Sequence, residues 1–197
     1  MFPYERRMFM PPKSRYCREK VLEEALNLVR EKGIEAVTAR RLAERLNSSP
    51  KVLFGIFESM EELRKDLLEY VGDFQRRYQE NYIESSPYPP YKSIGMAYIL
   101  FAANEPQLFR CLYMRDRSSE NKEGDWESIE PCVKMLAQNL GISPEDARMF
   151  QVEMWVYVHG IAAIMATSYE DWNEEQISRL LTDAYEGLKQ RFTGGKQ

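Results

Sequence analysis

Two short helices joined by a tight turn are predicted close to the N-terminus, and this feature constrains the fold of the chain most. Thr38 stands where an N-cap belongs, and residues 39–46 follow with leucines at helical spacing. Asn47 then begins a turn, Ser49 is a second candidate N-cap, and Pro50 occupies the first helical position, where its missing N–H costs nothing. We expect this second helix to run to about residue 56. Such a pair is the layout of a helix-turn-helix unit.

Longer helices are predicted on both sides of this pair. The apolar residues of 21–32 recur at helical spacing, and Gly33 is a plausible stop for that helix. Ser59 and Glu62 form a predicted capping box at the start of a long helix that runs to about residue 83. Further helices are expected at about 91–103, 106–115, 127–140, 145–168 and 174–192.

No segment of the sequence indicates a strand, so we predict an all-α fold of about nine helices. Residues 1–14 contain three prolines and three basic residues and are interpreted as a flexible tail. Residues 15–58 are predicted to form a helix-turn-helix domain, and residues 59–197 a helical-bundle domain for ligand binding and dimerisation.

The charge of the chain is unevenly distributed between these two regions. Residues 1–60 hold 12 Lys and Arg against 8 Asp and Glu, whereas residues 61–197 hold 15 against 23. A basic N-terminal region on an acidic body suits a phosphate-binding segment attached to a domain with another task. The three cysteines are far apart and lack a CxxC pair, which favours a reducing cytoplasm over a disulfide framework.

A set of small, apolar and capping residues recurs over about 45 residues of the N-terminal region: Ala25, Gly33, Thr38, Leu42, Ala43, Ser49, Leu53, Phe54, Phe57, Ser59, Glu61 and Leu63. Through these positions the region resembles the DNA-binding domain of the TetR family of transcription regulators. In the body, residues 155–160 are similar to the W-x-x-x-H-G motif of one TetR C-terminal subclass. The resemblance therefore implies a dimeric repressor with a small-molecule site in its body.

Several positions depart from the family pattern. Asn47 stands where Gly is usual, but Asn also tolerates a left-handed backbone. Phe54 replaces a Tyr whose hydroxyl normally reaches phosphate, Ile56 replaces His or Tyr, and Met60 replaces a Lys. Gly55 weakens the second short helix by about 1 kcal/mol relative to Ala. The ordinary DNA contacts of the family are therefore reduced in number.

The resemblance implies DNA contacts from the second short helix and the residues before it. The predicted DNA-binding residues are Thr38, Arg40, Arg41, Ser48, Ser49, Pro50, Lys51, Val52 and Phe54. Lys51 and the arginines are also explained by a solvated face, and Val52 either touches a thymine methyl group or packs on the head. Arg45 is a further phosphate candidate, and Arg6, Arg7 and Lys13 of the tail are candidates for a minor-groove arm.

The resemblance also implies a cavity between the body helices, lined by soft and aromatic side chains that suit a largely apolar effector. The predicted ligand-binding residues are Phe101, Phe109, Tyr113, Met114, Met154, Trp155 and His159. Each is also explained as an ordinary core residue. His159 is the only histidine, and it either packs in the core with a hydrogen bond or lines the pocket. It has no Cys or carboxylate partner at metal-ligand spacing, so neither a metal nor a cofactor is predicted.

The last two predicted helices carry more apolar surface than one monomer needs. Either they cap the core, or two such hairpins form a four-helix interface with two-fold symmetry; we expect the homodimer. The longest apolar run, residues 94–103, is too short to span a bilayer, and no membrane partner is predicted. No secretion signal precedes the first helix, which again favours the cytoplasm.

The predicted function is a ligand-responsive DNA-binding transcription regulator, expected to be a repressor, that recognises a palindromic operator as a dimer. An enzyme is not expected, because the sequence contains no GxSxG, P-loop, GxGxxG or HExxH motif. The remaining alternative is an interaction or sensor protein on a TetR scaffold whose DNA binding has degenerated. Phe54, Ile56 and Met60 motivate that alternative.

Overall fold

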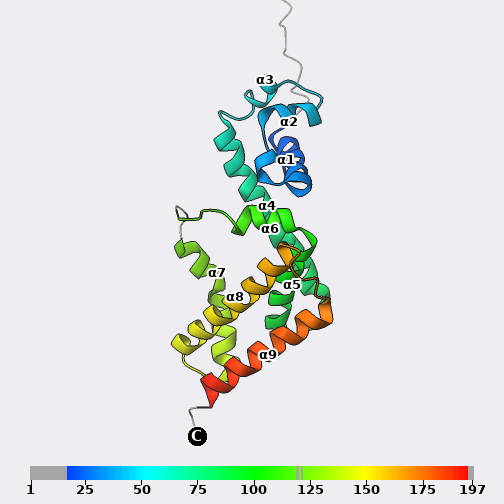
Figure 1. Ribbon diagram of the computed structural model, residues 1–197. Coiled ribbons are helices and arrows are strands. Elements are labelled where there is room, and N and C mark those ends of the chain that lie inside the picture. Colours follow the sequence, from blue (N-terminus) through cyan, green and yellow to red (C-terminus); the bar gives the residue numbers. More distant parts are fainter. Residues whose placement is uncertain (1–16, 119, 121, 195–197) are drawn as a thin grey trace, which may run out of the picture.

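The computed structural model describes residues 17–118, 120 and 122–194, which form an elongated molecule with a small head at one end and a larger body below it (Figure 1). Within these residues there are nine α-helices, one short 3-10 helix and no strand, in agreement with the predicted all-α fold. The predicted tail, with Arg6, Arg7 and Lys13, lies outside the described residues.

The head consists of α1 (Arg18–Lys32), η1 (Ile34–Ala36), α2 (Ala39–Arg45) and α3 (Pro50–Leu53). Its core forms because η1 and α2 pack against α1, α3 packs against α2, and α1 packs against α4. The buried side chains include Val21, Ala25, Leu42, Leu53 and Phe57. Gly33 ends α1 with a φ of 79°, as its position predicted, and its N–H donates to the Val29 carbonyl.

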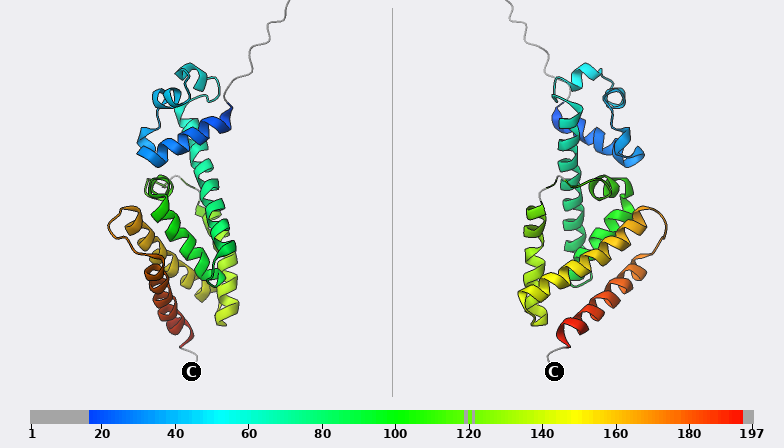
Figure 2. Two further views of the ribbon diagram at one scale, coloured as in Figure 1. Left: turned by 90° about the vertical axis from the view of Figure 1, so that its right-hand side faces the viewer. Right: turned by 60° about the vertical axis from the view of Figure 1, so that its left-hand side comes forward.

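Helix α4 (Met60–Ser85) connects the head to the body without a break. It contacts α1 at its upper part and α5 further along (Figure 2). Ser59 caps it as predicted, since the Ser59 hydroxyl accepts a hydrogen bond from the Glu62 N–H. The reciprocal half of the predicted capping box is wrong: the Glu62 carboxylate accepts from the Glu58 N–H, one residue earlier than Ser59.

The body is a bundle of five helices. These helices are α5 (Pro90–Asn104), α6 (Pro106–Tyr113), α7 (Lys122–Leu140), α8 (Pro144–Ala166) and α9 (Glu174–Thr193). Of these helices, α5 and α6 contact α4. Helix α6 lies across the top of the body directly beneath α1, and the chain turns back after α8 so that α9 returns towards the far end (Figures 1 and 2). Helix α8 contacts α5, α6, α7 and α9, so it is the centre of the bundle.

Helix α8 is also the one described helix that is long and apolar enough, by length and composition, to cross a membrane. The sequence estimate based on residues 94–103 overlooked it because Glu153 and His159 interrupt its apolar run. In this structure 39% of its apolar window is buried, including Phe150, Met154, Ala162 and Ala166.

Candidate nucleic-acid interface and ligand cavity

The turn between α2 and α3 has the geometry of a helix-turn-helix unit. The Thr38 hydroxyl accepts a hydrogen bond from the Arg41 N–H at 3.3 Å, which fixes the start of α2. Asn47 adopts a φ of 47°, the left-handed conformation that its side chain tolerates, and the Ser48 N–H donates to the Ala43 carbonyl at 2.9 Å. Ser49 is the N-cap residue of α3 as predicted, but its side chain makes no capping hydrogen bond.

Helix α3 is shorter than predicted. It ends at Leu53 rather than near residue 56, because the amides of Gly55 and Ile56 bond to carbonyls three residues earlier and tighten the chain into a turn. Leu53 is buried and anchors the helix, whereas Lys51, Val52 and Phe54 are exposed. The exposed fraction is 36% for Val52 and 49% for Phe54, so neither apolar side chain is used by the core of the head.

Most basic side chains of the described head are engaged by acidic ones. Arg45 binds Glu24 at 3.2 Å and Glu31 at 2.8 Å, so its guanidinium faces α1. Arg40 and Glu44 form an exposed pair at 3.0 Å, of a kind that contributes little to stability.

Three described cations of the head differ from these, since none forms an ion pair within the described residues: Lys32, Arg41 and Lys51. Of these three, Arg41 and Lys51 belong to the helix-turn-helix unit. Among the predicted DNA-binding residues close to them in sequence, Thr38, Ser49 and Pro50 are exposed and Ser48 is half-buried.

The head is joined to α6 by a charged contact. The Arg30 guanidinium donates to both carboxylate oxygens of Glu105, at 2.7 and 2.8 Å, and lies 5.0 Å from the centre of the Phe74 ring. A Cβ at Gly33 would lie 3.3 Å from the Gln107 side chain, so the end of α1 also approaches the start of α6 closely. A displacement of α6 therefore acts directly on α1.

A cavity of about 650 Å³ lies in the body between α5, α7, α8 and α9. This volume is within the range of pockets that hold drug-sized ligands. Its wall is mainly apolar and aromatic, and the larger side chains are those of Tyr91, Tyr98, Met135, Met154, Trp155, Leu181 and Tyr185.

Two of the seven predicted ligand-binding residues, Met154 and Trp155, line this cavity. Phe101 and Phe109 are fully buried in the core, and the Tyr113 hydroxyl donates to Gln75 at 2.7 Å. Met114 is 46% exposed at the end of α6, outside the cavity wall. Ligand contact at these seven positions remains a prediction.

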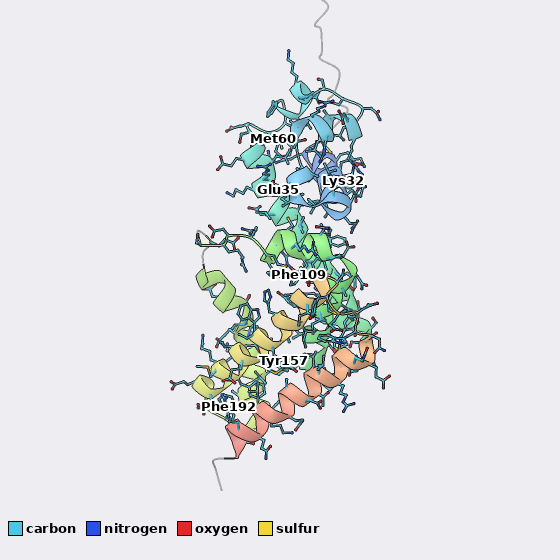
Figure 3. All side chains as sticks on the ribbon, viewed as in Figure 1. Lys32, Glu35, Met60, Phe109, Tyr157 and Phe192 are labelled. Atoms are coloured by element: carbon cyan, nitrogen blue, oxygen red, sulfur yellow. The ribbon has the colours of Figure 1, made fainter. Side chains whose placement is uncertain are left out.

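His159 lies just behind the cavity wall, within a cluster of aromatic rings. Its Nδ1 is 2.9 Å from the hydroxyl of Tyr98, which lines the cavity, and its ring stacks on Trp155 at 5.5 Å between centroids. On the other side it contacts Phe109 and Tyr113 of α6, at 5.7 and 6.0 Å (Figure 3 labels Phe109). Burial, and secondarily the charge of Arg117, lowers the pKa of His159, so the ring is neutral near pH 7.

Polar groups are few in the cavity wall and most are already bonded. The buried Tyr91 hydroxyl donates to the Gln151 side-chain oxygen at 2.7 Å, and burial raises the pKa of that phenol. Lys92 donates from Nζ to the Thr182 hydroxyl at 2.8 Å. Cys132 also lines the wall, and burial raises the pKa of its thiol.

Sequence reasoning did not select the cavity residues from α5, α7 and α9, such as Lys92, Met135 and Tyr185. A signal was present for Lys92: it is a lysine in the first turn of an apolar helix, and no acidic residue accompanies it there. Within the described residues, no group of three His, Cys, Asp or Glu side chains is arranged to hold a metal ion.

An apolar strip on the outer side of α8 and α9 is left uncovered by the monomer. Val156 is 58% exposed and Tyr157 is 40% exposed (Figure 3 labels Tyr157). Gly160 on α8 and Gly187 on α9 have open space where a Cβ would be. A shallow groove of about 300 Å³ between the two helices includes Tyr157 and Leu188 in its wall.

Two protein-family models match the sequence. Residues 21–67 match the family of bacterial regulatory proteins of the tetR type, and residues 91–186 match a C-terminal domain described as tetracyclin repressor-like. No curated protein matches this chain.

Several solved structures have the same fold at low sequence identity. A protein of unknown function from Rhodococcus sp. RHA1 is 19% identical, with a TM-score of 0.69, over 95% of this chain and 99% of that one. A TetR-like transcriptional regulator from the same organism is 16% identical, with a TM-score of 0.62, over 91% and 97% of the two chains. A TetR variant from Acinetobacter baumannii AYE in complex with minocycline is 18% identical, with a TM-score of 0.60, over 92% and 99%.

Proposed function

Because this chain belongs to the TetR family of DNA-binding transcription regulators, whose members are not enzymes, we propose that it is a ligand-responsive repressor that binds a palindromic operator as a homodimer. The observation that carries this proposal is the exposed end of the head, where Arg41 and Lys51 have no ion-pair partner in the described residues while most neighbouring cations do. Uncommitted cations beside a short exposed helix suit contact with phosphate.

The contacts with DNA are proposed for the predicted set at this end of the head. Lys51 and Arg41 bind phosphates, with Thr38, Arg40, Ser48, Ser49 and Pro50 around them. Val52 is presented to the major groove, where apolar side chains meet thymine methyl groups, and the Phe54 ring lies beside the phosphate backbone. We divide the chain functionally into a DNA-binding part, residues 15–58, and an effector and dimer part, residues 59–197, with α4 common to both.

The homodimer is proposed to form through α8 and α9. The uncovered strip supports this, since the exposed Val156 and Tyr157 of α8, beside the half-buried Leu188 of α9, suit burial against the same strip of a second copy. Gly160 and Gly187 permit close approach of the partner's helices, because neither position projects a side chain. A two-fold dimer also supplies the paired heads that a palindrome requires.

The cavity is the proposed effector site, and a similar structure solved in complex with minocycline supports small-molecule binding by a chain of this fold. Tyr98 and Trp155 line the cavity and both contact His159, which contacts Phe109 and Tyr113 of α6. A ligand that moves Tyr98 or Trp155 therefore acts on α6, and through Glu105 and Arg30 on the head. The ligand favours one spacing of the two heads over another. It can shift the equilibrium between these two states by no more than its difference in binding free energy for them.

The proposed place of action is the cytoplasm, where a DNA-binding regulator meets its operator. The three cysteines are unpaired, Cys17 exposed, Cys111 buried and Cys132 half-buried, which suits a reducing compartment.

A second candidate function is an interaction or sensor protein on the same scaffold without operator binding. Exposed Phe54 favours it, because an apolar side chain at the tip of the head is also suited to protein contact. Fluorescence anisotropy with promoter fragments from the source genome, at two salt concentrations, separates the two functions. Tight binding to one palindromic fragment that weakens with salt is expected for the repressor. Uniformly weak binding, with and without candidate effectors, would overturn the repressor function and support the second candidate.

A further inference from the structure

The two charged side chains of the described cavity wall differ in whether they have an ion-pair partner. Within the described wall there are two charged side chains, Lys92 and Glu186. Glu186 already has a cation, since its carboxylate lies 3.2 Å from the ammonium group of Lys189. No ion pair involves Lys92 within the described residues. The cavity therefore presents one positive charge that no carboxylate neutralises.

The surroundings of Lys92 hold its ammonium group in place. Its Nζ donates to the Thr182 hydroxyl at 2.8 Å and lies 4.7 Å from the centre of the Tyr88 ring. The Thr182 hydroxyl donates in turn to the Ser178 carbonyl at 2.9 Å, so it faces Lys92 as an acceptor. An ammonium group has three hydrogens, and one is used by Thr182; the others remain for a ligand.

Burial lowers the pKa of Lys92, which means that its surroundings oppose the charged form. An anion beside Nζ would favour the charged form, and a neutral ligand that displaced water from Nζ would oppose it further. The Gln151 side-chain oxygen accepts from Tyr91, so the amide nitrogen of Gln151 is a further hydrogen-bond donor in the cavity wall.

The rest of the wall has the opposite character. Tyr98, Trp155 and Tyr185 offer aromatic rings, and Met135, Met154 and Leu181 offer flexible apolar surface. A ligand that fits the whole cavity therefore needs an apolar body of moderate size and one anionic group.

We infer that the effector is an amphipathic carboxylic acid, whose carboxylate binds Lys92 while its apolar body occupies the aromatic part of the cavity. This inference rests on the proposed effector role of the cavity and adds the chemical class of the ligand. Lys92 determines specificity for the acid over its neutral and cationic analogues.

Calorimetric titration of the full-length protein with three matched probes tests the inference: naphthylacetate, naphthylethanol and naphthylethylamine. The acid is expected to bind at least about tenfold more tightly than the alcohol, because a charge-assisted hydrogen bond replaces a neutral one. Lys92→Met is expected to abolish this preference while the alcohol still binds. The matched control Lys134→Met, an exposed lysine of α7 outside the cavity wall, is expected to preserve it.

Equal affinity for the acid and the alcohol, tighter binding of the amine, or an acid preference that survives in Lys92→Met would each overturn the inference. Competition with decanoate then shows whether the cavity accepts alkyl carboxylic acids as well as aryl ones. Displacement of naphthylacetate at a similar concentration indicates that alkyl acids are included, and no displacement restricts the class to aryl acids.

Addition of naphthylacetate to the operator complex distinguishes the inference from the proposed function. If the acid binds through Lys92 but leaves operator anisotropy unchanged, the ligand class stands and the effector role is lost. If the alcohol and the acid bind equally and both change operator binding, the effector role stands and the ligand class is wrong.

Discussion

The head and the body of this protein use their charged and apolar side chains in opposite ways. In the head, acidic residues engage most of the described cations, and most apolar residues other than Val52 and Phe54 are buried in one core. In the body, a cavity and an uncovered apolar strip remain after the helices have packed, and one lysine in the cavity has no carboxylate partner among the described residues. The head therefore leaves few groups without partners as a monomer, whereas the body leaves the space and the apolar surface on which we propose a ligand and a second copy to bind.

Because of this difference, we expect electrostatic attraction to stabilise the proposed DNA interface and burial of apolar surface to stabilise the proposed dimer interface. DNA binding by the head depends on few free charges, so it is expected to be sensitive to each one and to salt. Association through the body depends on buried apolar area, so the free energy of dimerisation is expected to be large and nearly independent of salt. Each prediction that follows tests one side of this comparison.

The largest effect is expected from Val156→Arg on the uncovered strip. Two-fold symmetry would place the new charge in the interface twice, and a buried unpaired charge costs several kcal/mol, so the dimer dissociation constant should rise at least about a hundredfold. Analytical ultracentrifugation would measure it against the 23.2 kDa monomer. Tyr169→Arg, at a residue that is 78% exposed in the loop after α8, is the control and should leave the mass unchanged. A dimer that persists in Val156→Arg would place the interface elsewhere.

A smaller effect is expected from Lys51→Ala in the head. Without the Lys51 ammonium group, each subunit binds one phosphate fewer. Operator binding should therefore weaken about tenfold or more, and the slope of log affinity against log salt should fall by about one for each phosphate no longer neutralised. Arg45→Ala is the matched control, because its guanidinium is engaged by Glu24 and Glu31. It should lower the unfolding free energy by about 1 kcal/mol and leave the salt slope unchanged. The same change of slope in both variants would contradict the distinction between free and paired cations.

Phe54→Tyr should strengthen operator binding. Phe54 is 49% exposed, so a hydroxyl added to its ring has room to donate to phosphate and should improve affinity about three- to tenfold. Anisotropy titrations at fixed salt would measure the gain, with Phe57→Tyr as a buried contrast expected to destabilise the head instead. Unchanged affinity in Phe54→Tyr would mean that this side chain does not face DNA.

The smallest effect concerns the pH dependence of the body. Because burial lowers the pKa of His159, the unfolded chain binds the proton more readily than the folded one. The contribution of His159 to stability is therefore complete above about pH 6.5, the pKa of an unperturbed histidine, and is lost as the pH falls through the lowered value. Thermal unfolding of His159→Gln should show a flatter decline below about pH 6.5 than the natural protein. Identical curves would remove His159 from this role.

The head was largely predictable because its signals are local in sequence. Gly33 ends α1, Thr38 caps α2 and Asn47 takes the left-handed turn, each for a reason contained in the residue itself. The prediction failed where neighbours compete for the same groups. The Glu62 carboxylate accepts from the Glu58 N–H instead of the Ser59 N–H, because both amides are within its reach. Helix α3 ends at Leu53, earlier than predicted, in a tightened turn.

The cavity was only partly predictable because it arises from contacts between distant segments. Trp155 was named from a motif on α8 and Met154 as a flexible apolar residue of the body, and both line the cavity. Lys92 of α5 and Tyr185 of α9 line the same cavity. No residue spacing within either helix indicates that these two side chains share one wall. Helical periodicity shows which side of a helix is apolar, but not whether that side packs tightly or leaves a space.

The unbroken course of α4 has a mechanical consequence. Its 26 residues span roughly 39 Å at about 1.5 Å per residue. If its lower part tilts by about 5° within the bundle, its upper end moves by roughly 3 Å, close to the rise of about 3.4 Å between successive base pairs. In a symmetric pair, the two heads would move in opposite directions and the distance between them would change by up to twice that amount. A stiff rod of this length thus amplifies a small rearrangement around a ligand into a mismatch of about one or two base pairs at the operator.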